Sequence, residues 1–99
     1  MNSRVSYGDP SLTEIDLSYK EISNDHVIKL CEALAAVDKS YVNHIRLVGN
    51  RLLTDNCVPS ILKMLEKRKE IIEIDLYHTS ISNANEMKIN IKTNDNVSE

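Results

Sequence analysis

The chain has 99 residues and a mass of 11.2 kDa, which is the size of one small domain. Its 12 basic and 15 acidic side chains give a net charge of −3, and this balance argues against nucleic-acid and membrane partners that bind by bulk charge. Because no stretch approaches about 18 consecutive apolar residues and the amino-terminal segment lacks the apolar core of a signal peptide, we expect a soluble, cytoplasmic protein.

Residues 1–11 are polar and contain Gly8 and Pro10, which predicts an amino-terminal lead or cap. One motif then occurs three times, with aliphatic residues at its relative positions 1, 4, 6 and 11 and a period of 30 and then 29 residues. These aliphatic residues are Leu12, Ile15, Leu17 and Ile22, then Val42, Ile45, Leu47 and Leu52, then Ile71, Ile74, Leu76 and Ile81. The regularity predicts repeats over residues 12–41 and 42–70 and a partial third repeat over 71–82.

Between the copies of the motif, the spacing of the apolar residues becomes that of an amphipathic helix. The two predicted stripes lie 31 residues apart and comprise Val27, Leu30, Cys31 and Leu34, then Val58, Ile61, Leu62 and Leu65. Polar residues at 23–25 and 54–56 offer N-cap oxygens, and Pro59 falls near the first turn of the second helix. Charged residues at the end of that helix are expected to form its solvated side, or alternatively to contact an acidic partner. They are Lys63, Glu66, Lys67, Arg68, Lys69 and Glu70.

The strand segments alternate strictly between aliphatic and charged side chains. Their cores read Glu-Ile-Asp-Leu at residues 14–17, His-Ile-Arg-Leu at 44–47 and Glu-Ile-Asp-Leu at 73–76. A doubly wound sheet buries both faces and would need continuous apolar runs, so we expect helices on one face only. The predicted fold is therefore α/β: a short solenoid with a one-sided parallel sheet of about three strands and helices on its convex side.

The three motif copies, LxxIxLxxKxI, VxxIxLxxNxL and IxxIxLxxTxI, resemble leucine-rich repeats over residues 12–82. The 29–30-residue period with a full helix is similar to that of the ribonuclease-inhibitor-like subclass of long intracellular repeats. In that family, relative position 9 is usually Asn or Cys, whose side chain can hydrogen-bond backbone in the turn. Asn50 matches this pattern, whereas Lys20 and Thr79 depart from it.

The carboxy-terminal end is less regular than the repeats. Residues 83–91 begin like a third helix, with Met87 and Ile91 one turn apart, and can cap the last repeat. Residues 92–99 are polar and are expected to form a disordered tail. Without caps, the first and third strands would carry open edges.

The alternation also assigns the outward side chains of the sheet to three rows that run across the strands. The rows are Glu14, His44 and Glu73, then Asp16, Arg46 and Asp75, then Ser18, Val48 and Tyr77. Neighbouring strands lie about 4.8 Å apart, so acid–base–acid triples are expected to lie side by side. The second row can act as a charge ladder that stabilises the sheet, as a recognition surface, or as both.

Other kinds of chemistry find little support in the residues. A divalent ion held by Glu14, His44 and Glu73 is disfavoured, because a flat sheet spreads these ligands along a row. Both cysteines lie at apolar helix positions and are expected to be buried thiols, and the other two histidines are isolated. The sequence contains no phosphate-binding loop or hydrolase motif, so we expect no enzyme activity, cofactor or metal.

We predict a non-enzymatic interaction module that binds a protein partner of unknown identity through the charged, concave sheet face. The expected contact residues are Glu14, Asp16, His44, Arg46, Val48, Glu73, Asp75 and Tyr77. Arg and aromatic side chains contribute most to interface energies, so Arg46 and Tyr77 lead this set, with Tyr19 as a secondary contact at the rim. The alternative is a structural subunit that forms a homodimer or a larger complex through its open strand edges.

Overall fold

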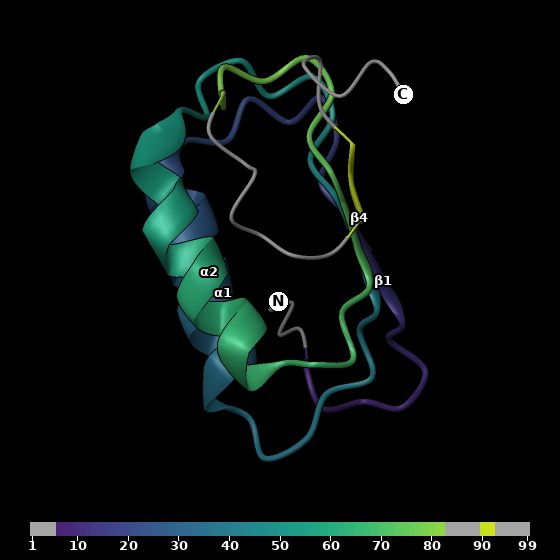
Figure 1. Ribbon diagram of the computed structural model, residues 1–99. Coiled ribbons are helices and arrows are strands. Elements are labelled where there is room, and N and C mark those ends of the chain that lie inside the picture. The colour runs from purple at the N-terminus through teal and green to yellow at the C-terminus, as the bar shows by residue number, and fades with distance from the viewer. Residues whose placement is uncertain (1–5, 83–89, 93–99) are drawn as a thin grey trace.

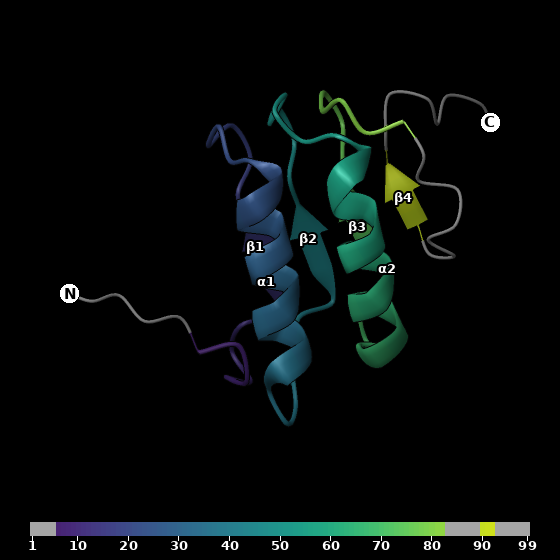
Figure 2. The same cartoon turned by 90° about the vertical axis from the view of Figure 1, so that its left-hand side faces the viewer.

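The computed structural model describes residues 6–82 and 90–92 of the chain. Its elements are β1 (Glu14–Asp16), α1 (Asn24–Ala36), β2 (His44–Arg46), the 3-10 helix η1 (Asp55–Cys57), α2 (Val58–Lys67), β3 (Glu73–Asp75) and β4 (Asn90–Lys92). The strands form one parallel sheet in the order β1-β2-β3-β4, and α1 and α2 lie side by side on one of its faces (Figures 1 and 2). The predicted α/β class is confirmed, but the sheet has four strands instead of about three.

The register of the strands puts equivalent residues of the three motif copies side by side. Ile15, Ile45 and Ile74 are aligned across β1, β2 and β3, and all three are buried. The residues before and after each isoleucine point to the other face, because side chains alternate along a strand. The predicted alternation of buried aliphatic and outward polar residues is therefore confirmed for these strands.

Helix α1 buries the predicted apolar stripe, since its buried residues are Val27, Leu30, Cys31 and Leu34. Ser23 is the N-cap residue, and its backbone N–H donates to Nδ1 of His26 at 3.0 Å. A side chain of the first turn thus satisfies the N-cap donor, as in a capping box. His26 is exposed, as expected of an isolated histidine, and this local contact accounts for its position.

Helix α2 buries a different stripe from the predicted one. Val58 and Ile61 are buried as expected, but the third buried residue is Met64, whereas Leu62 and Leu65 are only partly buried at the margin of the core. Met64 lies one turn after Ile61 on the inward side, and its flexible thioether side chain adapts to the space beneath the sheet. Neither helix of the described residues is long and apolar enough to cross a lipid bilayer.

The turn after each of the first three strands contains a residue with positive φ. Tyr19, Gly49 and His78 occupy the same relative position and have φ values of 57°, 78° and 62°. The second turn is one residue longer than the alignment implies. Leu53 is 0% exposed and takes the inward position assigned to Leu52, which is 59% exposed. The longer spacing of 31 residues between the helical stripes, against 30 between the strand motifs, reflects this extra residue.

The carboxy-terminal segment departs from the expected cap helix. Asn90 and Ile91, which we expected at the end of a helix over 83–91, instead form β4 with Lys92 and pair with β3. This pairing supplies hydrogen-bond partners to a strand edge that would otherwise be open. The rest of the expected helix, the remainder of the expected tail and residues 1–5 of the lead lie outside the described residues.

Candidate protein-binding face

The sheet face opposite α1 and α2 carries the predicted contact residues, and we call it the open face (Figure 1). It consists of Glu14, Asp16 and Ser18, then His44, Arg46 and Val48, then Glu73, Asp75 and Tyr77. Strand pairing aligns the first member of each triple in one row and the second members in the next, which confirms the two predicted strand rows. Backbone hydrogen bonds continue past the strands, from the Tyr19 N–H to Val48 and from the Gly49 N–H to Tyr77.

The ion pair of Arg46 differs from the predicted charge ladder. Nη1 of Arg46 lies 3.6 Å from Oε2 of Glu14, diagonally between neighbouring strands, whereas the ladder required Asp16 and Asp75 as its partners. Hydrogen bonds from the side chain and backbone N–H of Ser18 instead lower the pKa of the Asp16 carboxyl, and the charge of Arg46 adds to that effect. Solvent screens the Arg46–Glu14 pair, because both side chains are 45% exposed, and the pair therefore stabilises the fold little.

The β3 side of the open face is more enclosed than the β1 side. Nε2 of His44 lies 3.6 Å from Oε2 of Glu73, and the two side chains are 28% and 17% exposed. Asp75 is only 6% exposed, and its Oδ1 accepts a hydrogen bond from the backbone N–H of Tyr77 at 3.4 Å. Of the predicted contact residues, Asp75 is thus the least accessible to a partner.

Aromatic side chains border the open face where β1 and β3 end. Tyr19 is 70% exposed and Tyr77 is 38% exposed, and the partly buried Val48 follows β2 between them. The ring of Tyr19 lies over Gly49, where a Cβ atom would collide with it. Beside Tyr19 is a shallow hollow of about 520 Å³, lined by Asp16, Ser18, Tyr19, Lys20, Arg46 and Val48.

The remaining candidate residues are the cysteines and histidines. No group of three or more His, Cys, Asp or Glu side chains there is placed to hold a metal ion. Cys31 and Cys57 are free and buried, as predicted, and burial raises the pKa of their thiols to about 12 and about 11. Both thiols are therefore protonated at neutral pH, and the thiolate needed for nucleophilic chemistry is scarce. His78 is exposed, with its ring centroid 6.4 Å from that of Tyr77.

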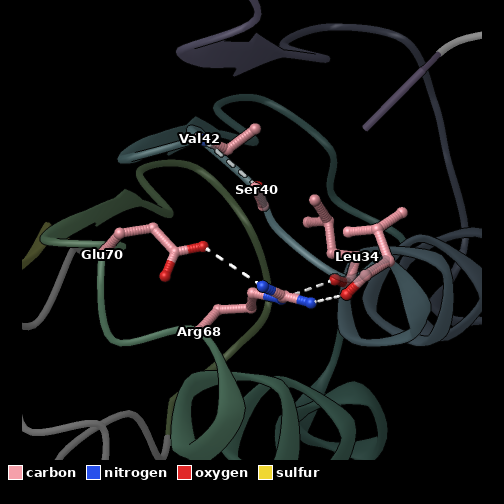
Figure 3. A network of polar contacts seen from close by, with 6 residues as sticks. Leu34, Ser40, Val42, Arg68 and Glu70 are labelled. Carbon is pink, nitrogen blue, oxygen red and sulfur yellow. Dashed lines mark hydrogen bonds and ion pairs between the residues drawn. The ribbon is translucent and has the colours of Figure 1, made fainter. Parts of the chain in front are cut away.

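Arg68 corrects the prediction that the charged end of the second helix is solvated. It is 6% exposed, and its guanidinium donates to the backbone carbonyls of Leu34, at 2.8 Å, and Val37 at the end of α1 (Figure 3). Nη1 of Arg68 also lies 3.8 Å from Oε2 of Glu70. The sequence carried a signal for this position: Ile61, Met64 and Arg68 are spaced three and four residues apart, which continues the inward phase of α2.

Asn50 links the first two turns, as the family resemblance implied. It is 0% exposed, and its Oδ1 accepts hydrogen bonds from the backbone N–H groups of Lys20 and Ile22 at 3.0 and 3.3 Å. Its Nδ2 donates to the carbonyls of Leu17 and Leu47 at 2.9 and 3.0 Å. The Asn50 side chain thus makes two hydrogen bonds through its oxygen and two through its nitrogen. These bonds fix the first two turns relative to each other.

Thr79 also bonds its turn, although it departs from the family pattern. Its Oγ1 donates to the carbonyl of Leu76 at 2.9 Å and accepts from the N–H of Ile81 at 3.3 Å. A threonine hydroxyl therefore replaces part of what an asparagine supplies at this position.

No protein-family model, curated protein or solved structure matches this chain.

Proposed function

We propose that this chain is a non-enzymatic interaction module, built as a short leucine-rich-repeat-like solenoid, that binds a protein partner through its open face. The repeated unit of strand, turn and helix supports this proposal, as does the inter-turn bonding of Asn50. Solenoids of this kind bury one sheet face against their helices and offer the other for binding. The two buried, free thiols fit a reducing compartment, so we place the protein in the cytoplasm.

The observation that carries the proposal is the mixed character of the open face. The exposed guanidinium of Arg46 and the exposed ring of Tyr19 line one hollow of this face, and the partly exposed Tyr77 borders the face where β3 ends. Arg and Tyr are enriched among the residues that dominate interface energies, because each combines a polar tip with a large contact area. None of these three side chains belongs to the buried core.

A peptide-display selection against the purified chain tests the proposal. The peptides recovered are synthesised, and their affinities are measured for the wild type and for Arg46→Ala/Tyr77→Ala. Truncation of central interface residues costs about 2 kcal/mol or more each, so we expect the double variant to bind at least tenfold more weakly.

The matched control is Lys63→Ala/Lys67→Ala, which removes two exposed side chains from the helical side of the molecule. This variant should bind the peptides with wild-type affinity, and circular dichroism should show that both variants are folded. If the open-face variant keeps wild-type affinity, or if only the helical variant loses binding, the proposed site is wrong.

The second candidate is a structural subunit that associates through the edge of β1. Leu12, Leu17, Ile22 and Ile28 on this side are only partly buried against the core, and β1 is an edge strand of the described sheet. An unpaired edge next to incompletely buried aliphatic residues favours strand addition by another chain. The opposite edge fits this candidate less well than expected, since β4 pairs with β3.

Sedimentation equilibrium over about a hundredfold range of concentration separates the two candidates. A monomer at all concentrations supports binding through the open face alone. A dimer that forms with increasing concentration, and that is weakened by a proline at Glu14, would support the structural subunit instead. The backbone groups of Thr13 and Leu17 bond to the β2 side, so those of Glu14, which alternate with them, face the open edge.

A further inference from the structure

The hollow on the open face has an imbalance of charge that points to the chemistry of the partner. Its lining holds two cations, Lys20 and Arg46, and one carboxylate, Asp16. The carboxylate already accepts hydrogen bonds from Ser18. The cations of the lining thus exceed its carboxylates by one, and Glu14, the partner of Arg46, lies outside the lining.

The hydrogen-bonding capacity of the two cations is largely unused. The charge of the Lys20 ammonium lowers the pKa of the Asp16 carboxyl, but no hydrogen bond fixes this ammonium within the described part of the chain. Arg46 makes one ion pair there, with Glu14. A guanidinium offers five N–H donors, so Arg46 can bind a further carboxylate in the two-bond geometry that such groups prefer. The other acidic residues of this face are already engaged, since Glu73 lies beside His44 and Asp75 accepts from the N–H of Tyr77.

One wall of the hollow is apolar. Tyr19 is 70% exposed and lies over Gly49, and Val48 lines the hollow from the segment that follows β2. An aliphatic or aromatic side chain that contacts both would bury apolar surface next to the two cations. Because the hollow is shallow and lies open along the sheet, a continuous extended segment can cross it.

We propose that this hollow binds an Asp or Glu side chain of an extended partner segment, held by Lys20 and Arg46, with an adjacent apolar side chain against Tyr19 and Val48. The inference rests on the proposed function, because it specifies what the partner presents to the same face. An acidic segment is expected even though the whole chain has a net negative charge. The side chains that line the hollow, more than the net charge of the chain, determine which charged group binds there.

The test uses three synthetic peptide arrays of 12 residues that share the same varied apolar positions. One array carries Glu at its central position, one carries Gln and one carries Lys. The full chain should bind Glu peptides about 1.4- to 5-fold more tightly than their Gln counterparts, which is the range measured for exposed ion pairs. The Lys peptides should bind more weakly than both.

Two variants sharpen the result. In Lys20→Ala and in Arg46→Ala, the preference for Glu over Gln should fall toward one, whereas Lys63→Ala should keep it. Raising the ionic strength from about 0.05 M to about 0.5 M should reduce the preference in the wild type, because salt screens exposed charges.

The outcomes also separate this inference from the proposed function. Equal binding of Glu and Gln peptides, or tighter binding of Lys peptides, overturns the inference if Tyr77→Ala still weakens all three arrays. Binding that is unaffected by Tyr77→Ala and by Arg46→Ala overturns both, since the peptides would then lie elsewhere on the chain.

Discussion

The first repeat (residues 12–41) and the second repeat (42–70) share one motif but are buried to different extents. Leu17 is partly buried, whereas its counterpart Leu47 is 2% exposed, and Leu12 differs in the same way from Val42, which is 0% exposed. The difference arises because β2 lies between two neighbouring strands and β1 lies at the edge of the sheet (Figure 2). The position of a strand in the sheet, more than its own sequence, thus determines how much each aliphatic side chain contributes to stability.

The turn after β1 and the turn after β2 also differ, in the hydrogen bonds that their side chains make. Asn50 is buried and makes four hydrogen bonds, two of them to backbone N–H groups of the first turn. Lys20 holds the same relative position in the first repeat and is exposed, and β1 is the first strand of the described residues. A side chain in this position can link two turns only where another turn lies beside it, as the first turn lies beside Asn50.

The largest expected effect is the loss of stability in Leu47→Ala, for which Leu17→Ala is the comparison. Removing the fully buried Leu47 side chain should lower the free energy of unfolding by about 4 kcal/mol, because the surrounding core leaves a cavity. Leu17→Ala should cost about 1–2 kcal/mol, since water reaches part of that side chain already. Urea unfolding followed by circular dichroism measures both, and equal losses would contradict the difference in burial.

Asn50→Ala should lower the free energy of unfolding by about 3 kcal/mol, because it leaves four backbone groups without their partner. Amide hydrogen exchange should accelerate at Lys20 and Ile22, because their N–H groups donate hydrogen bonds to the Asn50 side chain in the wild type. Lys20→Ala is the matched control at the same position of the first repeat, and it should change stability by less than about 0.5 kcal/mol. A similar loss in the two variants would show that Asn50 does not link the turns.

The sequence predicted the sheet well because its signal is a strict alternation. The isoleucines at 15, 45 and 74 face the core in register, as their spacing indicated. Single-residue features were harder to predict: Arg68 belongs to a charged run, and only the phase of α2 marks it as buried. The strand over residues 90–92 follows a segment with helical spacing, so pairing with the open edge of β3 outweighed the local pattern there.

For the open face, the sequence predicted which residues are aligned across the strands, but it did not predict which side chains form ion pairs or hydrogen bonds. Strand alternation fixed which side chains lie next to each other, including Glu14 beside His44. It did not reveal that Arg46 pairs diagonally with Glu14, or that Asp75 is 6% exposed. Those facts depend on side-chain rotamers and on the depth of each position, which spacing alone does not encode.

Arg68→Ala tests how much the hydrogen bonds between Arg68 and the end of α1 contribute to stability. The change removes the donors to the carbonyls of Leu34 and Val37 at the end of α1, and we expect a loss of about 2 kcal/mol. Lys67→Ala, the neighbouring exposed residue, should change the free energy of unfolding by less than about 0.5 kcal/mol. Thermal and urea unfolding of both variants provide the comparison, and an unaffected Arg68→Ala would mean that water replaces these bonds.

Gly49→Ala should have the smallest effect, a loss of about 1 kcal/mol. Its φ of 78° disfavours a side chain, and the added methyl group would meet the ring of Tyr19. Made in a Tyr19→Ala background, the same substitution should cost less, because the ring is gone and the strain of the backbone remains. A double-mutant cycle of urea unfolding measures this coupling, and a coupling of zero would show that the ring does not rest on Gly49.

The proposal that the open face binds a protein partner is tested most directly by NMR, with a selected peptide titrated into the isotope-labelled chain. If the open face is the binding surface, the largest amide shift changes should cluster at Asp16, Arg46, Val48 and Tyr77, and those of α1 and α2 should be small. Changes confined to the β1 edge or to the helices would contradict the claim and would place the interaction elsewhere on the molecule.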